Sequence, residues 1–545
     1  MTLRDCMMER PLLISSLIAY GAANHGAVEI VSRSVEGPIH RYTYAEAYGR
    51  ICKLANALRT LGVERGDRIA TLAWNTHRHF ELYYAISGFG AVCHTINPRL
   101  FREQIIYIVN HAADRFLFVD LTFVPLLEEI WDELEAPEAV VVMTDREHMP
   151  AANLPGALCY EELIAAETDS FDWPEFDERA AAALCYTSGT TGDPKGALYG
   201  HRSSILHALA LLALMDGRMT SRDAMLMVVP MFHVCAWSLP YLAPITGVKI
   251  VLPGPGYDGE SLYELLESEK VTFSAGVPTI WLTFFDYLRE SGKSLTHLRT
   301  LLCGGSAPPL SLIREIEDRG IEFVQGWGMT ETSPVGVLCV LKEEMDALPQ
   351  DQRLERKLKQ GRPPFGYELK IVDGEGQPLP HDGTSTGELC VRGPWVIKEY
   401  FANEAATAAA FDDEGWFRTG DIGAIDPDGY LQLTDRAKDL IKSGGEWISS
   451  IDLENAAMGH PDVAQAAAIA RPHPKWVERP LLLVIPRDGA APGKDDILEH
   501  LKQKVARWWL PDDVVFVESF PMTATGKVSK ARLRERFKDY DLPTA

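Results

Sequence analysis

Short apolar runs alternate with longer amphipathic stretches through most of this chain. Examples are RIATLAW (68–74), AVCHTI (91–96) and RFLFVD (115–120), and the same texture continues from AMLMVVP (224–230) to IEFVQGWG (321–328). Apolar runs of this length, separated by helical patterns, are typical of strands that are joined by crossover helices. The sequence therefore predicts an α/β fold with largely parallel sheets.

The texture changes after about residue 360. Short strand patterns separated by Gly and Asp turns appear in ELKIVDGEGQPL (368–379), GELCVRG (387–393) and AIDPDGYLQLTD (424–435). Closely spaced strands with such turns are typical of antiparallel sheets. We therefore expect a small β-rich, barrel-like unit over about 360–436.

The length of the chain, 545 residues, is too great for one hydrophobic core. Hydrophobic residues make up 46% and charged residues 24%, which is typical of an ordinary globular protein. A compact α+β pattern follows Arg436, with the strand candidates VAQAAAIA and PLLLVIP. We expect a large N-terminal domain over 1–436 and a small, mobile α+β domain over 437–545.

Charge and cysteine content exclude several kinds of protein. The formal net charge of -24 argues against nucleic acid as a partner, because neutralising phosphates requires clustered Lys and Arg. Nine cysteines lie between Cys6 and Cys390 without a CxxC pair, so a reducing cytoplasm fits better than a disulfide framework. Residues 11–23 favour an amphipathic helix, and prolines divide the apolar stretch 224–248. We expect no membrane span.

The loop TSGTTGDPKG (187–196) carries the clearest chemical signal. It contains four small hydroxyl residues, three glycines and Lys195, and it follows the strand-like run AAALCY. Glycines let the backbone approach an anion closely, while amides, hydroxyls and the lysine attract it. The Walker A spacing cannot be drawn through these residues. The loop is therefore predicted to cradle phosphate; a flexible surface loop is the alternative.

Six further motifs follow this loop in order and extend the pattern over nearly the whole chain. They are PMFHVCAW (230–237), CGGSAPP (303–309), GWGMTETSP (326–334), FRTGDIG (417–423), DRAKDLIKSGGEWIS (435–449) and PMTATGKVSK (521–530). With the loop, they make the chain resemble the adenylate-forming superfamily of acyl-CoA synthetases, luciferases and peptide-synthetase adenylation domains. The resemblance implies two steps, in which ATP converts a carboxylic acid to its acyl-adenylate and coenzyme A then takes the acyl group.

The resemblance assigns a nucleotide site to these motifs. Trp327 stands where the family usually has a tyrosine that stacks on adenine, and an indole keeps the flat π-face. Asp421 and Arg436 are expected at the ribose. The complete predicted set for ATP and AMP is Thr187, Ser188, Gly189, Thr190, Thr191, Gly192, Lys195, Gly304, Gly305, Ser306, Ala307, Gly326, Trp327, Gly328, Met329, Thr330, Asp421, Arg436, Lys438 and Lys527.

The resemblance also implies a magnesium site and a mobile lysine. Thr187 and Glu331 match the Mg²⁺ ligands, and this ion prefers few protein oxygens. Lys527 matches the lysine that bridges carboxylate and phosphate, so we expect catalysis by positioning and electrostatics. His233 is expected to gate the pocket and orient the acid, with a satisfied core histidine as the alternative.

A moving C-terminal domain is implied for the second step. Lys438 matches the hinge position of the family. In the family, the small domain rotates about this hinge after adenylation, and the rotation would carry Lys527 away from the site. A loop then enters the site to build the thiol tunnel for coenzyme A. The residues that match this loop are Lys442, Ser443, Gly444, Gly445, Glu446 and Trp447.

The choice of acid is the finest part of the resemblance. Cys235 and Ala236 stand where amino-acid-activating relatives carry an aspartate, which favours an acid without an α-amine. PLLISSLI near the start and the stretch 73–101 are similar to methylmercaptopropionate-CoA ligases, which implies 3-(methylthio)propionate as substrate. The expected acyl pocket consists of His233, Trp237, Cys303, Gly304 and Pro334.

Other readings remain open at this point. A short- or medium-chain fatty acid is the first alternative, because apolar pockets discriminate weakly between acids of similar shape. A luciferase-like oxygenase would share all nucleotide motifs, and a non-catalytic acyl- or nucleotide-binding protein would typically lack Lys527 or Glu331. A homodimer is a further expectation.

Overall fold

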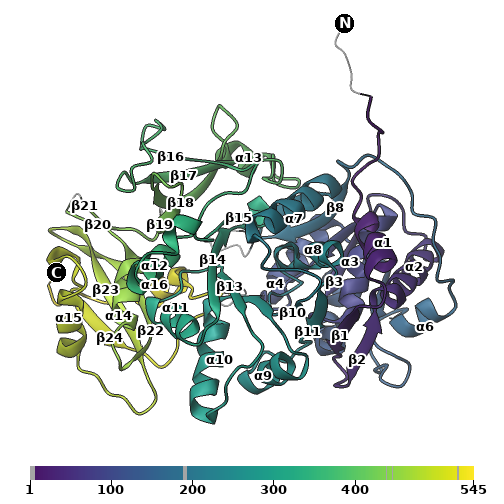
Figure 1. The fold of residues 1–545 in the computed structure, drawn as a ribbon, viewed down its shortest axis with the longest axis horizontal. Coiled ribbons are helices and arrows are strands. Elements are labelled where there is room, and N and C mark those ends of the chain that lie inside the picture. Colours follow the sequence, from purple (N-terminus) through teal and green to yellow (C-terminus); the bar gives the residue numbers. More distant parts are fainter. Residues whose placement is uncertain (1–5, 188–192, 437, 445, 524–526, 545) are drawn as a thin grey trace, which may run out of the picture.

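The computed structural model describes residues 6–187, 193–436, 438–444, 446–523 and 527–544 (Figure 1). Two large, mainly parallel sheets lie next to each other in the N-terminal part, as the alternating pattern predicted. An antiparallel sheet and a smaller α+β region follow along the chain. The predicted mixed α/β class is confirmed.

The first large sheet has seven strands in the order β7-β6-β5-β3-β4-β8-β9. Neighbours run parallel except β8 and β9, which form an antiparallel hairpin around the TSGTTGDPKG loop. Its strands are β3 (Arg68–Leu72), β4 (Val92–Thr95), β5 (Phe116–Val119), β6 (Ala139–Val142), β7 (Leu158–Cys159), β8 (Ala181–Tyr186) and β9 (Gly196–Gly200). The helices along this part of the chain are α2 (Tyr44–Thr60), α3 (His77–Phe89), α4 (Arg102–Ala112), α5 (Val124–Ile130) and α6 (Tyr160–Ala165).

The second large sheet has eight strands in the order β15-β14-β13-β12-β10-β11-β1-β2. Only its two edge strands, β2 and β15, run antiparallel to their neighbours. Its strands are β1 (Glu29–Arg33), β2 (Ile39–Thr43), β10 (Ala224–Met227), β11 (Lys249–Leu252), β12 (Phe273–Gly276), β13 (Thr300–Gly304), β14 (Glu322–Gly328) and β15 (Val335–Leu338). The helices are α7 (His201–Met215), α8 (Leu239–Thr246), α9 (Gly259–Ser268), α10 (Pro278–Ser291), α11 (Leu310–Asp318) and α12 (Gln350–Lys357).

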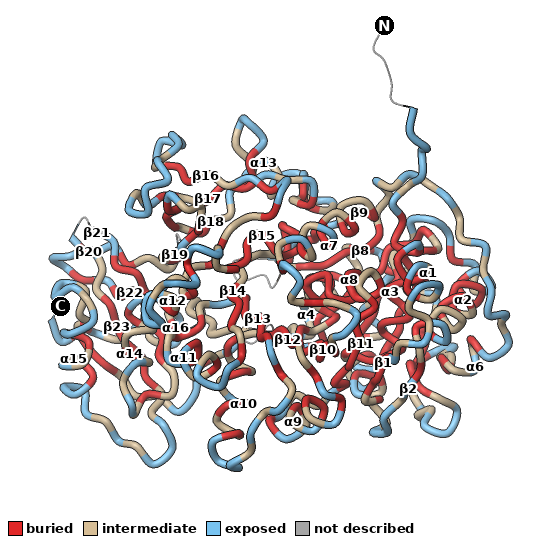
Figure 2. Tube along the Cα trace, in the orientation of Figure 1, coloured by how far each residue is buried: buried red, intermediate tan, exposed pale blue. Residues whose placement is uncertain are grey.

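Helix α3 lies in the core that joins the two sheets. Twelve of its 13 residues are buried, which is the pattern of a helix covered on all sides. It packs against α1 (Ile14–His25), α2 and strands of both sheets. Figure 2 shows the buried residues concentrated along these N-terminal sheets and the helices between them. The two sheets therefore share a core, through which α3 contacts strands of both.

The β-rich unit is an antiparallel sheet in the order β16-β17-β18-β19. Its strands are β16 (Glu368–Val372), β17 (Gly387–Arg392), β18 (Phe417–Ile425) and β19 (Leu431–Arg436), with α13 (Glu404–Ala410) between the second and third. It occupies the residues for which closely spaced strands and turns were predicted.

The C-terminal region has its own sheet and two small cores, one on each face. The strands are β20 (Ile441–Ser443), β21 (Glu446–Ile448), β22 (Val463–His473), β23 (Val477–Pro486) and β24 (Asp513–Phe516). The helices are α14 (Ser450–Met458), α15 (Lys494–Lys502) and α16 (Lys530–Arg536). This region lies at the end of the molecule opposite α1 and α2 (Figure 1). A domain boundary at 436/437 remains a prediction.

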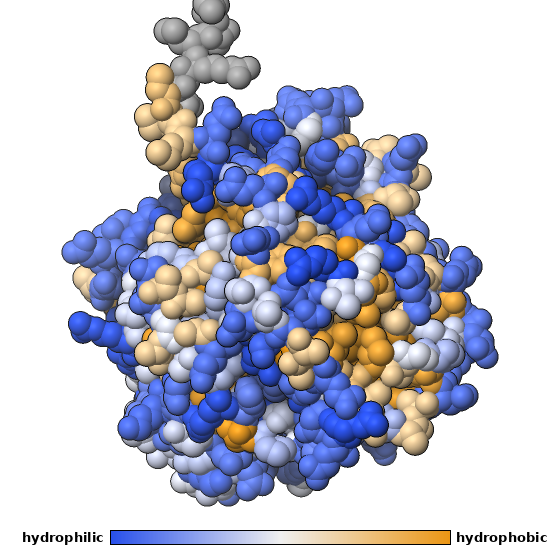
Figure 3. Space-filling view, turned by 90° about the vertical axis from the view of Figure 1, so that its right-hand side faces the viewer, coloured by the Kyte–Doolittle hydropathy of each residue, from blue (hydrophilic) through white to orange (hydrophobic). Residues whose placement is uncertain are grey.

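The two apolar segments that resemble membrane sequences fold as expected. The first contributes α1, and the second divides into β10, a short 3-10 turn (Val234–Ser238) and α8. In the described part of the chain, no helix combines the length and apolar character needed to cross a membrane. Figure 3 shows that polar residues cover much of the N-terminal face, with apolar patches between them.

Candidate active site

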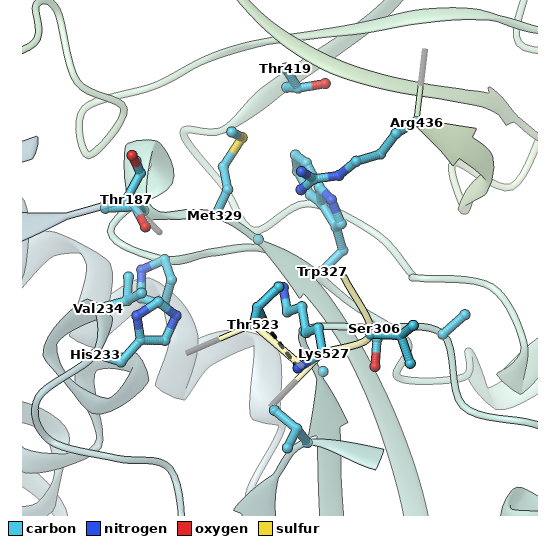
Figure 4. Close-up of a pocket in the computed structure, with 18 of the residues that line it drawn as sticks. Thr187, His233, Val234, Ser306, Trp327, Met329, Thr419, Arg436, Thr523 and Lys527 are labelled. Atoms are coloured by element: carbon cyan, nitrogen blue, oxygen red, sulfur yellow. Dashed lines mark hydrogen bonds between the residues drawn. The ribbon is translucent and has the colours of Figure 1, made fainter. Parts of the chain in front are cut away.

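A cavity of about 940 Å³ lies where several chain segments leave the carboxyl ends of their strands. Its walls include residues that directly follow β8, β10, β12, β13 and β14, and the C-terminal region contributes Lys527. Open α/β sheets bind ligands at this edge, because the loops there converge and are free to carry function. The cavity is therefore the candidate active site (Figure 4).

Most of the predicted site residues that the structure describes border this cavity. They are Thr187, Lys195, His233, Trp237, Gly304, Gly305, Ser306, Ala307, Gly326, Trp327, Gly328, Met329, Thr330, Glu331, Pro334, Arg436, Lys438 and Lys527. Asp421 does not border the cavity itself but contacts Trp327 and Arg436, which do. Ser188, Gly189, Thr190, Thr191 and Gly192 lie outside the described residues, as does Gly445.

The base of the predicted phosphate loop is closed by hydrogen bonds between its two ends. The Thr187 amide donates to the Lys195 carbonyl at 2.9 Å, and the Lys195 amide donates to Thr187 Oγ1 at 3.1 Å. The hairpin of β8 and β9 continues from this pair. Thr187 and Lys195 are thus held next to each other at the cavity wall.

Trp327, Asp421 and Arg436 form a connected polar group. The Trp327 indole N–H donates to Asp421 Oδ2 at 2.8 Å, and Arg436 Nε lies 3.1 Å from Asp421 Oδ1. Asp421 is 3% exposed, so its charge is buried with these two partners. The tryptophan therefore has a polar function that the sequence did not reveal: its N–H orients the carboxylate expected at the ribose.

Lys527 reaches the cavity from the C-terminal region. Its Cε lies 3.5 Å from the position of a Cβ on Gly305, which has a φ of +88° that favours glycine. Its backbone amide donates to Thr523 Oγ1 at 3.1 Å (Figure 4). Burial and, to a smaller degree, the charge of Arg436 lower the pKa of Lys527 to about 8, and Asp421 opposes this shift. An anion in the cavity would favour the charged form.

His233 lies at the cavity wall after strand β10. Burial and, to a smaller degree, the charge of Lys527 lower its pKa to about 3. The imidazole is therefore neutral near pH 7 and available for hydrogen bonding. This state agrees with an orienting function for His233 and gives it little strength as a general base.

Glu331 is 5% exposed and lies in the short 3-10 helix Thr330–Thr332. Tyr400 donates its hydroxyl hydrogen to Glu331 Oε1 at 2.7 Å. Burial raises the pKa of the Glu331 carboxyl, and the Tyr400 hydrogen bond opposes this shift. Within the part of the chain that the structure describes, no other side chain donates to this carboxylate. A carboxylate and the Thr187 hydroxyl are hard oxygen donors, so the residues fit Mg²⁺.

Trp237, a predicted acyl-pocket residue, borders the cavity and belongs to an unusual turn. Residues Val234–Ser238 all have positive φ values, from 46° to 61°, and all five are buried. Left-handed backbone costs about 1–2 kcal/mol per non-glycine residue, which the surrounding packing must offset. The Val335 amide donates to His207 Nε2 at 3.1 Å, so Nδ1 donates to Ser238 Oγ at 2.6 Å. His207 thereby anchors the turn.

One predicted acyl-pocket residue is not at the cavity. Leu302 and Gly304 border it, whereas Cys303 between them is fully buried in the core on the other face of β13. Alternate residues of a strand point to opposite faces, so a motif that includes three consecutive residues cannot place all of them in one pocket. In this structure Cys303 therefore does not border the cavity, contrary to its predicted place in the acyl pocket.

The described residues of the predicted thioester-step loop do not border the cavity. Lys442, Ser443, Gly444 and Trp447, together with the backbone of Glu446, belong to the hairpin of β20 and β21, and none of them borders the cavity. The Gly444 amide donates to the Trp476 carbonyl at 2.8 Å, and the Trp447 side chain is 49% exposed. In this structure Lys527 of the C-terminal region borders the cavity, whereas the described residues of the loop do not.

Comparisons with known proteins support the same assignment. The sequence profile described as AMP-binding enzyme matches residues 20–401, and that of the AMP-binding enzyme C-terminal domain matches residues 452–527. The 3-methylmercaptopropionyl-CoA ligase of Ruegeria lacuscaerulensis is 48% identical and covers 98% of both chains. The long-chain-fatty-acid–CoA ligase of Thermus thermophilus is 49% identical over 98% of this chain and 97% of its own.

A solved structure shows the same fold. The anthranilate CoA ligase AuaEII in complex with anthranoyl-AMP aligns with a TM-score of 0.85 at 24% identity, over 97% of this chain and 98% of that chain. The order of motifs, the position of the cavity and these full-length similarities agree. The chain therefore belongs to the AMP-binding enzyme family, in its group of adenylate-forming acid–CoA ligases.

Proposed function

We propose that this protein activates 3-(methylthio)propionate with ATP and transfers the acyl group to coenzyme A. A carboxylate oxygen would attack the α-phosphorus of ATP and release pyrophosphate; the coenzyme A thiolate would then attack the acyl carbon and release AMP. The observation that carries the proposal is the meeting of Lys527 with the wall that contains Thr187 and Glu331 in one cavity. A mobile cation opposite a phosphate-binding wall suits the first step.

The nucleotide would occupy the polar part of this wall. Thr187, Lys195 and the glycine-rich loop would hold the pyrophosphate end of ATP, and Trp327 would stack on the base. Asp421 accepts from Trp327 and pairs with Arg436, and its oxygens have remaining lone pairs for the ribose hydroxyls. Mg²⁺, when bound, would neutralise phosphate oxygens as a Lewis acid. Thr187 and Glu331 are the residues proposed to hold it.

Lys527 would promote the first step through the positive charge of its ammonium group. Two anions, the acid and ATP, must approach each other, and a single ammonium that contacts both lowers this repulsion. His233, neutral and next to the cavity, would donate or accept one hydrogen bond at the acid. No covalent enzyme intermediate is needed, because the adenylate is already activated.

The second step would require a different arrangement of the C-terminal region. We propose that the parts 1–436 and 437–545 are separate domains that rotate about Lys438. Rotation would withdraw Lys527 and bring the loop of residues 442–447 to the cavity to guide the thiol. Supporting this, Lys527 borders the cavity while the described residues of the loop do not.

The acid itself is inferred from the relatives and from the acyl wall. The Ruegeria lacuscaerulensis ligase is named for 3-methylmercaptopropionate, yet the Thermus thermophilus ligase named for long-chain acids is equally similar. Trp237 approaches within 3.1 Å of the position of a Cβ on Gly304, so a bulky residue narrows the cavity there. A cavity that is narrow at this point favours a small acid. A short- or medium-chain fatty acid is the alternative substrate.

A pyrophosphate-release screen tests this choice. It would compare 3-(methylthio)propionate with straight-chain acids from acetate to dodecanoate, each over a range of concentrations. We expect the highest kcat/KM for 3-(methylthio)propionate and for pentanoate, which has a similar length. A wide preference for dodecanoate would contradict the assigned acid, and release of pyrophosphate with none of the acids would contradict the ligase function.

Assembly and location belong to the same proposal. We infer a homodimer in the cytoplasm, where the nine unpaired cysteines of the chain would stay reduced. Sedimentation equilibrium of the purified protein would test the dimer, with a mass near that of one 60.5 kDa chain as the contrary result.

A further inference from the structure

One short segment of the β-rich unit touches both parts of the proposed pyrophosphate and magnesium site. The Ile397 amide donates to the Glu331 carbonyl at 2.9 Å, and the Phe401 amide donates to the Gly196 carbonyl at 2.8 Å. Gly196 directly follows Lys195, which closes the phosphate loop. The segment 397–401 thus ties the backbone on both sides of the site together, and Tyr400 lies within it.

The Tyr400 side chain repeats this connection with two different groups. Its hydroxyl donates to Glu331 Oε1 at 2.7 Å, and the ammonium of Lys195 lies 5.1 Å from the centre of its ring. Tyr400 is 6% exposed and Glu331 is 5% exposed, so water competes little with either contact. The hydrogen bond from a hydroxyl to a carboxylate depends on direction, whereas the attraction between a cation and a ring persists when the cation shifts over the ring face.

The structure around Tyr400 holds its ring in place. Thr407 Oγ1 accepts from the Tyr400 amide at 3.0 Å, and the ring packs edge-on against Phe417 at 6.5 Å. A tyrosine fixed in this way restricts the rotamers of Glu331, whose side chain otherwise has three rotatable bonds. It occupies Oε1 and leaves the rest of the carboxylate for another partner.

We propose that Tyr400 is a positioning residue that orients Glu331 for Mg²⁺ and aligns Lys195 with the pyrophosphate end of ATP. This inference rests on the proposed role of Glu331 as a magnesium ligand. The hydroxyl of Tyr400 affects metal binding through Glu331, and the ring of Tyr400 affects nucleotide binding through Lys195. The two effects are therefore separable by substitution.

Tyr400→Phe removes only the hydroxyl and provides the first test. The probe is Mn²⁺, titrated by electron paramagnetic resonance into enzyme loaded with a non-hydrolysable ATP analogue. We expect Mn²⁺ affinity to fall about tenfold, the size of effect of losing one hydrogen bond to a charged group. Binding of the analogue without metal should stay unchanged, because the ring under Lys195 remains.

Adenylation kinetics give a second measure of the same variant. The Mg²⁺ concentration for half-maximal pyrophosphate exchange should rise about tenfold, while kcat at saturating Mg²⁺ changes much less. Tyr400→Leu also removes the ring, so it should additionally weaken binding of the metal-free analogue. Equal nucleotide affinity in the Phe and Leu variants would overturn the part assigned to the ring.

Tyr160→Phe is the matched control, because it breaks the same kind of bond elsewhere. Tyr160 donates to Glu81 Oε2 at 2.7 Å, and both residues are buried in the N-terminal core, where Arg50 pairs with Glu81. This variant should lower Tm without changing Mn²⁺ affinity. A Mn²⁺ loss as large as that of Tyr400→Phe would show a general effect of destabilisation and overturn the inference.

The variant Glu331→Gln distinguishes a wrong role for Tyr400 from a wrong role for Glu331 as a magnesium ligand. If Glu331→Gln binds Mn²⁺ as the unchanged protein does, the magnesium role of Glu331 is wrong. If it binds weakly while Tyr400→Phe binds normally, only the role of Tyr400 is wrong. We expect both to bind weakly, and the double variant to bind no more weakly than Glu331→Gln alone, since Tyr400 acts through Glu331.

Discussion

The proposed nucleotide side and the proposed acyl side of the cavity are held in place by different forces. On the nucleotide side, buried charges are paired at short range: Asp421 with Trp327 and Arg436, and Glu331 with Tyr400. On the acyl side, Trp237 is held mainly by packing. Hydrogen bonds to a charged group are directional, whereas packing depends on the volume of the side chains. The nucleotide side should respond to the loss of single atoms and the acyl side to changes in size.

The largest effect is expected on the charged side, with Lys527→Ala. Adenylation measured by pyrophosphate exchange should fall by about a hundred- to a thousandfold or more, because the charge between two anions is lost. ATP binding and Tm should be retained, and thioester formation from supplied acyl-adenylate should be nearly normal. Unchanged pyrophosphate exchange would contradict the role of Lys527.

The acyl side should respond to volume with a change of selectivity. Trp237→Ala should raise the ratio of kcat/KM for octanoate over 3-(methylthio)propionate by about 10- to 100-fold, because added methylenes gain apolar contacts. The KM for ATP should change by less than about twofold. A large rise in the KM for ATP with no change in acid preference would reverse the distinction between the two sides.

The pH dependence of adenylation tests whether the nucleotide side of the cavity depends on the charge of Lys527. Burial lowers the pKa of Lys527 to about 8. We propose that the protonated form is the active one. We expect kcat/KM to be level below about pH 8 and to fall about tenfold per pH unit above it, since this parameter reports the free enzyme. Lys527→Arg should keep its charge and lose this alkaline decline, whatever its absolute rate. A decline that persists in the Arg variant would assign it to another group.

The smallest functional effect is expected for Cys303→Ala. Its side chain lies in the core on the far face of β13, so the profile of accepted acids should not change. The loss of a buried sulfur should lower Tm by about 1–3 °C. A changed acid profile would show that the acyl wall includes this residue after all.

The C-terminal region shows how sequence and structure contributed to different conclusions. Its motif PMTATGKVSK pointed to Lys527 because the family resemblance covers these residues, and the cavity includes that lysine. The loop residues 442–447 were equally recognisable, yet their described members lie outside the cavity. A sequence motif is the same in every domain orientation, so only the structure distinguishes which of the two segments is at the site.

The residues missed by the sequence analysis share one property. Tyr400 is separated from Glu331 by 69 positions, and the residues around it, KEYFAN, have no pattern that points to a carboxylate. The hydrogen bond between Val335 and His207 also joins residues far apart in the sequence, as does the bond from the Trp327 indole to Asp421. Cys303 lies outside the cavity for a related reason: membership of a motif does not tell which face of a strand a residue occupies.

The sequence alone predicted the α/β class, many of the strands, the motif order and the family, because these depend on local periodicity and on short contiguous patterns. The tertiary structure decided that Tyr400 binds Glu331, that Cys303 faces away from the cavity and that Lys527 rather than the loop of residues 442–447 reaches the site. Such contacts join segments far apart in the chain, and their geometry depends on how whole layers pack. The same packing fixes the position of Trp237, on which we propose that the choice of acid depends.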